Sequence, residues 1–274
     1  MLLNYVSLSS HPRIFRKLVG LSIDEFNIIL EKLSLSLKNA FSSKGRPRKL
    51  KQDADKLLLL FMYYRSYATH EFLGYFVGLD NSNVCRLFRV LEPLVASKIH
   101  IEKDRTLTED KILDILLDVT EQPIQRPKNK QAKKQYYSGK KKRHTQKFEI
   151  AMTTAGKIIN VSTTEPGHRH DLRIRQRGSP MPAGATKYVD LGYQGWQNTT
   201  NRVKLPHKKP KRGKITAEQK AENRNHSKTR IYVEHKFAQF KKFRILSETY
   251  RNFRRKHNMR VNIIAGVLNL QAGC

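Results

Sequence analysis

The sequence predicts a helical N-terminal region, residues 1–109, followed by an α/β domain with a mixed sheet, residues 110–274. Two observations support this division. Through much of the first hundred residues, apolar side chains recur at steps of three and four, which is the periodicity of an amphipathic helix. After Asp110 the pattern changes to short apolar or alternating runs separated by turn residues, interspersed with helical stretches, which is typical of an α/β domain.

The charge of the chain limits its partners. Its 274 residues include 54 Lys and Arg against 23 Asp and Glu, a formal net charge of +31. These positive charges repel one another unless a polyanion neutralises them. Nucleic acid is therefore the first expected partner and an anionic membrane surface the second. Two cysteines, Cys85 and Cys274, are too few for a disulfide-stapled secreted fold. No apolar run is long enough to cross a bilayer, and the first residues lack the features of a signal peptide.

The first long helix has a clear start signal. Ser22 is a candidate N-cap with Glu25 three residues on, the spacing of a capping box. The apolar positions that follow at helical spacing are Ile23, Phe26, Leu30, Leu33 and Leu37. A basic linker broken by Gly and Pro, residues 42–53, separates this helix from a second one over residues 54–67.

Residues 69–91 have the pattern of two short helices joined by a glycine turn. Thr69 caps the first helix, Gly78 ends it, and the second helix runs from Asn81 to about Leu91 and stops near Pro93. This is the spacing of a helix-turn-helix, although an ordinary helical hairpin has the same pattern. The charge of the chain favours a DNA-reading pair. Its exposed candidates are Asn81, Asn83, Arg86 and Arg89, and its predicted buried stripe is Val84, Leu87, Phe88 and Leu91.

The second domain is predicted as a hairpin-containing sheet, with one helix between its strands and two helices after the last strand. The predicted strands are residues 112–119, 147–152, 158–161 and 185–190, with a turn at Ala155-Gly156. The predicted helices are residues 167–177, 230–244 and 258–270.

Two basic stretches lie beside these strands. Residues 126–147 contain ten Lys or Arg and no acid, with Tyr136 and Tyr137 among them, and residues 204–214 form the second stretch. A charge run is usually only a solvated segment. Here a role in holding phosphates is favoured, with the tyrosines able to stack on unpaired bases. The densest group of cations is Lys140, Lys141, Lys142 and Arg143.

Three acids in this basic chain call for an explanation. Asp118 and Asp190 each end a predicted strand, and Glu234 lies on a predicted helix. Each alone is explained by a turn or by a surface ion pair. Together, two strand-end carboxylates and one helix carboxylate can converge on one point, which is the oxygen-rich environment that Mg²⁺ prefers. Two such ions would serve phosphoryl transfer.

The order of motifs between Asp118 and Tyr250 is specific. The segments are DVTEQPIQRP, YYSGKKKRHTQKFEI, EPGHRHDLRI, VDLGYQG and RIYVEHKFAQFKKFRIL. In this order they resemble the DDE transposases of bacterial insertion sequences, in the group related to eukaryotic Harbinger elements. The resemblance implies an RNase H-like catalytic domain, with Asp118, Asp190 and Glu234 as the catalytic and metal-binding triad. Arg230 and Lys241 fall on the family's Arg and Lys positions, where both could contact DNA.

The sequence departs from the family at two places. Ser227 stands where related families often have Tyr, and Gly167-His168 stands where Gly-Ser is common. Neither belongs to the triad. The pair His170-Asp171 superficially matches a metallohydrolase ligand set but lacks further spaced histidines. Asp171 is expected at a helix N-terminus near the active site, where the pair could assist the metals. Trp196 is a candidate for base stacking or for the core.

The resemblance implies a transposase with Mg²⁺ or Mn²⁺, two ions, as cofactor. It would bind the terminal inverted repeats of its element, cleave the element end with water, and use the released 3′-hydroxyl to attack target DNA. Holding two ends implies at least a homodimer on double-stranded DNA, in the bacterial cytoplasm and at the nucleoid, with no membrane partner. The alternatives are a transposase-derived DNA-binding protein without activity, a regulator that uses only the helix-turn-helix, and an RNA-binding protein.

Overall fold

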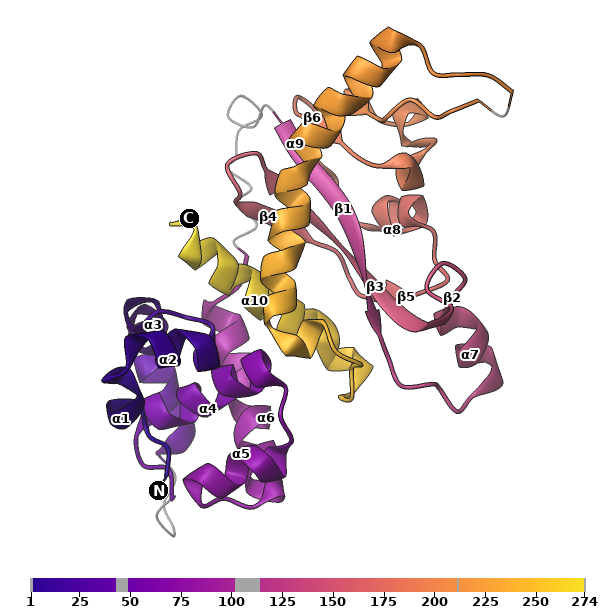
Figure 1. The fold of residues 1–274 in the computed structure, drawn as a ribbon. Coiled ribbons are helices and arrows are strands. Elements are labelled where there is room, and N and C mark those ends of the chain that lie inside the picture. The colour runs from indigo at the N-terminus through magenta and orange to yellow at the C-terminus, as the bar shows by residue number, and fades with distance from the viewer. Residues whose placement is uncertain (1, 43–48, 102–113, 211, 274) are drawn as a thin grey trace. The chain divides into compact units, whose positions relative to one another are not determined.

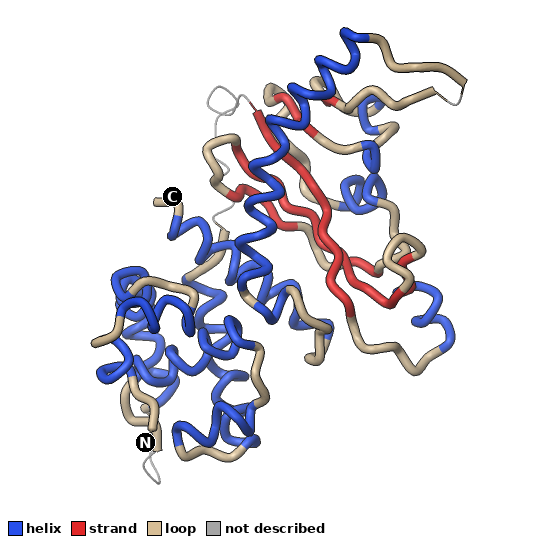
Figure 2. The backbone as a smooth tube through the Cα atoms, in the orientation of Figure 1, coloured by secondary structure: helices blue, strands red, loops and turns tan. Residues whose placement is uncertain are grey.

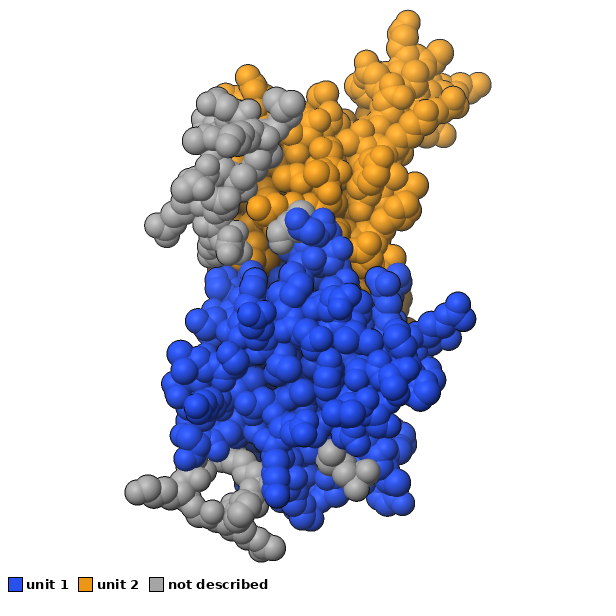
Figure 3. All heavy atoms as spheres, turned by 90° about the vertical axis from the view of Figure 1, so that its left-hand side faces the viewer, with its two compact units in different colours: residues 1–100, 240–248, 259–273 blue, residues 101–239, 249–258, 274 orange. Residues whose placement is uncertain are grey.

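The computed structural model describes residues 2–42, 49–101, 114–210 and 212–273. The chain divides into two compact units (Figure 3). Unit 1 contains residues 1–100, 240–248 and 259–273, and unit 2 contains residues 101–239, 249–258 and 274. The division predicted after residue 109 falls among residues 102–113, outside those described.

Unit 1 begins with a run of helices (Figure 2). Their apolar stripes are buried. They are α1 (Tyr5–Ser9), α2 (Pro12–Val19), α3 (Ile23–Phe41), α4 (Asp53–Ser66), α5 (His70–Val77) and α6 (Asn81–Lys98). The capping box predicted at Ser22 and Glu25 is present at the start of α3, with both hydrogen bonds formed. Phe26, Leu33 and Leu37 are fully buried, as the periodicity of this helix predicts.

The helix pair α5–α6 confirms the pattern predicted for residues 69–91. Thr69 caps α5 by accepting a hydrogen bond from the backbone of Phe72, and Gly78 ends it with φ 68°, a left-handed conformation that glycine adopts without strain. Val84, Leu87, Phe88 and Leu91 are buried. The polar side chains on the other face of α6, Asn81, Asn83, Arg86 and Arg89, are exposed.

The predicted end of α6 near Pro93 is wrong, because the helix continues through Pro93 to Lys98. Proline removes one backbone hydrogen bond from the helix. Pro93 and Arg89, four residues earlier, are both exposed, so water can serve the carbonyl that loses its partner. On the other face of the helix, Val95 extends the buried stripe. The free energy gained by burying apolar side chains of this extra turn outweighs the free energy lost with one backbone hydrogen bond.

Unit 1 is completed by the last part of the chain. The helix α10 (His257–Gln271) contributes five fully buried apolar side chains, Val261, Ile263, Ile264, Ala265 and Val267. Arg260 donates to the buried carboxylate of Glu92 at 2.7 Å and 2.6 Å. A side-chain atom on Gly266 would stand 3.0 Å from the backbone at Ile99 and His100, so this glycine permits close approach of the two segments.

Unit 2 is a mixed sheet with helices (Figure 1). Its described strands run in the order β2-β3-β1-β6-β7, with β4 and β5 paired to β3. They are β1 (Asp114–Pro123), β2 (Tyr137–Ser138), β3 (Arg143–Thr153), β4 (Ile158–Val161), β5 (Glu165–Pro166), β6 (Thr186–Tyr188) and β7 (Val203–Lys204). β1 pairs antiparallel with β3 and parallel with β6. This arrangement confirms the predicted α/β fold and the turn at Ala155-Gly156 between β3 and β4.

Both faces of the sheet are covered, which is why all of Thr145 to Met152 in β3 is buried. On one face, Phe148 packs with Phe237 and His257, at ring distances of 6.3 Å and 5.8 Å. On the other face lies a separate apolar cluster: Ile115, Leu117, Ala151, Ala185, Val189, Tyr193 and Trp196. Trp196 is therefore a core residue, the second of its two predicted roles.

The helices of unit 2 differ from prediction at their ends. They are α7 (Lys130–Tyr136), α8 (Asp171–Arg177) and α9 (Ala217–Lys242), with 3₁₀ turns at Leu191–Tyr193, Trp196–Asn198 and Arg254–Lys256. The helix predicted over 167–177 begins only at Asp171, because Glu165–Pro166 pairs with β3 as a strand. The helix predicted from Arg230 begins at Ala217, and its first turns are mostly exposed and polar, without an apolar stripe to reveal them. Within the described residues, no helix has the length and apolar character to cross a membrane.

Candidate active site

The centre of the candidate site is the middle of β1. Asp118 lies on this strand, between the antiparallel partner β3 and the parallel partner β6. In the parallel register Asp114 faces Thr186 and Leu116 faces Tyr188. Continuing this register brings Asp190, just past the end of β6, level with Asp118. Two acids that lie 72 positions apart in the sequence are thus brought to one place by strand pairing.

The backbone after β6 holds Asp190. Its carboxylate caps the short 3₁₀ turn Leu191–Tyr193 by accepting a hydrogen bond from the Gly192 amide at 2.9 Å. A side-chain atom on Gly192 would stand 2.9 Å from this carboxylate and 2.7 Å from the carboxylate of Asp171. Only glycine leaves room for both acids at this point, which explains the glycine in the segment VDLGYQG.

Asp118 has a perturbed pKa. Burial raises the pKa of this carboxyl to about 6, the nearby charge of Arg230 opposes the shift, and the negative charges of Asp190 and Asp171 add to it. A guanidinium nitrogen of Arg230 lies 3.2 Å from an Asp118 oxygen, and both side chains are mostly shielded from solvent. The three acids therefore share one electrostatic environment, and the arginine is the cation that partly neutralises it.

Helix α9 carries the third predicted acid. Arg230 and Glu234 are one turn apart on this helix and lie on the same side of it. Figure 1 shows α9 passing across the sheet, and Arg230 makes the contact with Asp118. Glu234 is exposed to solvent, one turn beyond that contact. Lys241 is exposed near the end of the same helix, in a segment of unit 1.

The pair His170-Asp171 lies at the start of α8. His170 is the N-cap residue and Asp171 is the first helical residue, which agrees with the prediction that Asp171 lies at a helix N-terminus. A buried lysine fixes the acid: Lys147 on β3 lies 3.1 Å from Asp171 and 3.3 Å from Glu121. Its ammonium also donates to the carbonyl of Arg169 at 3.0 Å. Asp171 is thus held beside Asp190 by a cation from the sheet.

A buried polar network behind the site was not anticipated from the sequence. Arg175 on α8 forms an ion pair with Glu149 on β3, and the Tyr193 hydroxyl donates to the same carboxylate at 2.9 Å. Burial raises the pKa of Glu149 to about 7 and raises that of Tyr193 well above its ordinary value. Alternation along β3 suggests that Lys147 and Glu149 face solvent. Because α8 covers that face, they are buried instead.

The predicted DNA-binding cations are placed on the surface. Arg86 and Arg89 are exposed on α6 of unit 1. The group Lys140, Lys141, Lys142 and Arg143 is exposed in unit 2, where the tip of the hairpin joins β2 to β3. Lys142 has φ 52°, a left-handed conformation that closes this turn.

The donor set at the centre of the sheet fits a hard divalent cation. Within the described residues, no three His, Cys, Asp or Glu side chains are gathered closely enough to hold one ion. Asp118 and Asp190 nevertheless supply neighbouring carboxylate oxygens, the ligand type that Mg²⁺ prefers. Asp118 already contacts a positive group, Arg230. Its pKa is raised first by burial and then by the negative charges of Asp190 and Asp171, and a metal ion would offset those charges.

Comparison with known proteins gives a consistent result. Residues 117–269 match a family described as DDE superfamily endonuclease, and residues 48–100 match the helix-turn-helix of DDE superfamily endonuclease. The chain is 32% identical, over 94% of each sequence, to a protein of Microchaete diplosiphon described as the probable transposase for insertion sequence element IS702. It is 25% identical, over 88% of each sequence, to a protein of Streptomyces albus G described as the "Putative transposase for insertion sequence element IS112". No solved structure matches the chain.

Proposed function

Because this chain belongs to the DDE superfamily endonucleases, we propose that it is a DNA transposase that cleaves the ends of its element and joins them to target DNA. The observation that carries the proposal is the parallel register of β1 and β6, which brings Asp118 and Asp190 together beside Arg230. The charge of +31 and the exposed cations of α6 support double-stranded DNA as the partner.

The proposed roles follow from the positions of the side chains. Asp118, Asp190 and Glu234 would hold two divalent ions, Mg²⁺ or Mn²⁺, which supply Lewis-acid activation of the attacking oxygen and of the phosphodiester. The Gly192 amide and the 3₁₀ turn orient Asp190, and Lys147 holds Asp171 beside it. Arg230 neutralises Asp118 and would help to draw the phosphodiester into the acidic centre.

In the first reaction, a water oxygen bonds to phosphorus and the bond from phosphorus to the 3′-oxygen breaks, which leaves a 3′-hydroxyl and a 5′-phosphate. In the second, that 3′-hydroxyl bonds to a phosphorus of target DNA and displaces another 3′-oxygen. No side-chain nucleophile is required. Arg86 and Arg89 on α6 would read the terminal inverted repeats, and Lys140 to Arg143 would contact phosphates. Holding two ends at once implies a dimer or larger assembly on DNA.

A cleavage and strand-transfer assay tests the proposal. The substrate is DNA with the element's own ends, incubated with the full chain and Mg²⁺ or Mn²⁺. Asp190→Ala and Glu234→Gln should reduce cleavage to the level measured in EDTA. Because Glu234 is exposed, its substitution should change the free energy of unfolding by less than about 0.5 kcal/mol.

The matched control is Glu218→Gln, which removes an exposed acid from the first turn of the same helix and should leave cleavage unchanged. Tight binding of the element ends without cleavage in either metal would contradict the catalytic proposal. It would favour a transposase-derived DNA-binding protein instead.

A further inference from the structure

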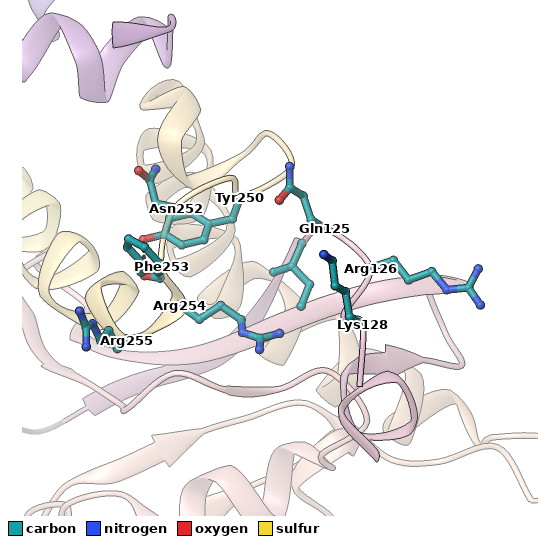
Figure 4. Close-up of a pocket in the computed structure, with 9 residues that line it drawn as sticks. Gln125, Arg126, Lys128, Tyr250, Asn252, Phe253, Arg254 and Arg255 are labelled. Atoms are coloured by element: carbon teal, nitrogen blue, oxygen red, sulfur yellow. Dashed lines mark hydrogen bonds between the residues drawn. The ribbon is translucent and has the colours of Figure 1, made fainter. Parts of the chain in front are cut away.

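A basic pocket lies in unit 2, just past the end of β1 (Figure 4). It has a volume of about 570 Å³ and is lined by two segments, residues 124–128 just after β1 and residues 250–255. Among the described residues that line it, four are cations, Arg126, Lys128, Arg254 and Arg255, and none is an acid. Its charge therefore suits an anionic ligand.

The floor of this pocket is fixed to the end of β1. The backbone amide of Tyr250 donates to the carbonyl of Pro123 at 2.8 Å, and Ile124 and Tyr250 form a parallel bridge. The Tyr250 ring is buried and meets His257 edge-on at 4.9 Å. His257 in turn shares a hydrogen bond of 2.7 Å with Gln122 on β1. The two segments are thus held together before any ligand arrives.

The pocket also exposes an aromatic ring. Phe253 is 68% exposed, although a phenylalanine gains free energy when its ring leaves water. The guanidinium of Arg255 lies 5.6 Å from the centre of this ring, and that of Arg254 lies 4.4 Å from the ring of Tyr136. Arginines beside exposed rings provide charge for a phosphate and a flat surface for a base.

A second pocket continues this surface. Arg126 lines it too, together with Lys133, Lys134, Tyr137 and His144. Tyr137 is 44% exposed. Each pocket therefore combines several cations with one exposed ring. That combination is typical of sites that hold single-stranded nucleic acid by stacking and phosphate contacts, because every base has a flat face.

We propose that the pocket around Phe253 binds an unpaired nucleotide of a DNA strand. Its base stacks on Phe253, and its phosphates lie among Arg126, Arg254 and Arg255. Ile124 follows Asp118 by six positions along extended backbone, which corresponds to a distance of about 20 Å. A strand of DNA spans that distance in about six nucleotides. In transposition, this pocket would hold DNA that is unpaired near the cleaved end, a role that rests on the proposed function. The binding itself does not depend on cleavage.

The test is equilibrium binding of the full chain to labelled oligothymidine and to an abasic strand of equal length, in EDTA. The abasic strand keeps the phosphates and lacks the bases. We expect oligothymidine to bind about tenfold more tightly, since stacking on one ring accounts for a difference of this size. Phe253→Ala should reduce this preference severalfold, and Phe253→Tyr should keep it.

Charge is tested separately. Arg254→Ala should weaken binding of both strands by a similar factor and lower the salt slope by about one. The matched control is Arg173→Ala, which removes an exposed arginine from α8 and should weaken binding less. Binding is measured in EDTA, where the proposed cleavage does not occur, so a failure of cleavage leaves this result intact.

Three results would overturn the proposal. The first is equal affinity for the thymidine and abasic strands. The second is a preference that survives Phe253→Ala in full. The third is tighter binding of oligouridine than of oligothymidine, which would assign the pocket to RNA.

Discussion

Asp118 is the residue whose environment most clearly departs from that of an ordinary surface acid. It is a carboxylate on a central strand, largely shielded from water, with two further acids near it and one arginine in contact. Such an arrangement costs folding free energy when the carboxyl is ionised, because burial and like charge both disfavour the anion. A protein that retains this buried carboxylate must gain a function in return, and we propose that the function is the binding of divalent cations.

The cost at Asp118 is measurable as a pH dependence. Its folded pKa of about 6 lies above the ordinary value, so the folded state binds the proton more tightly and loses stability as pH rises from about 4 to 6. The Asp118→Asn variant should therefore have the same free energy of unfolding as the unchanged protein below pH 4. Above pH 6, in EDTA, the variant should be more stable by on the order of 3 kcal/mol, because the folded pKa lies about two units above the ordinary value. Denaturant unfolding across this range is the measurement, and a difference that does not change with pH would contradict the assignment.

The site residues were predictable to different degrees. Asp118 and Asp190 stand out in the sequence because each is an acid predicted to end a strand in a basic chain. The strand β1 in fact continues past Asp118 to Pro123. The contribution of Lys147 was not predictable, since alternation along β3 places it on a face that is covered only once α8 has folded onto it. The contact between Arg254 and Tyr136 joins residues more than a hundred positions apart, and no local pattern indicates it.

At the scale of elements, helix boundaries marked by a capping residue were predicted best. Capping residues such as Ser22 and Thr69 act through their own neighbours, so the sequence contains the whole cause. Pro93 is different, because the turn that follows it is stabilised by burial of Val95 in unit 1. The early part of α9 is exposed, so it lacks the periodicity by which a helix is recognised.

The turn between α5 and α6 offers a test at this scale. A side-chain atom on Gly74 would stand 2.3 Å from the carbonyl oxygen of Leu79, so the turn folds back closely onto α5. In an exposed helix, Gly→Ala is stabilising by about 1 kcal/mol. Here we expect Gly74→Ala to lower the free energy of unfolding by about 1–3 kcal/mol, because the turn must move.

The matched control is Gly139→Ala, at a site where nothing lies within 4 Å. It should change stability by less than about 0.5 kcal/mol. Thermal or denaturant unfolding distinguishes the two variants. A stabilised Gly74→Ala variant would show that the close approach is absent in solution.

At the scale of the whole molecule, the net charge of +31 acts on stability as well as on binding. Without DNA, like charges repel across the surface and favour the unfolded chain. Salt screens this repulsion, with a Debye length that falls from about 10 Å at 0.1 M to about 3 Å at 1 M. We therefore expect the unfolding temperature to rise with sodium chloride concentration, and to rise further with a bound polyanion such as heparin. Differential scanning fluorimetry measures this, and a fall with added salt would contradict the argument.

The path of the chain through unit 1 has a consequence for synthesis. A ribosome makes residues 1–100 first, but the same unit also needs residues 240–248 and 259–273. Until Arg260 emerges, Glu92 lacks the arginine that neutralises it in a buried position. The helices proposed to recognise DNA therefore gain their full support only after unit 2 has been translated. A prematurely terminated chain would lack this support, and we expect it to bind the proposed DNA target more weakly than the finished protein.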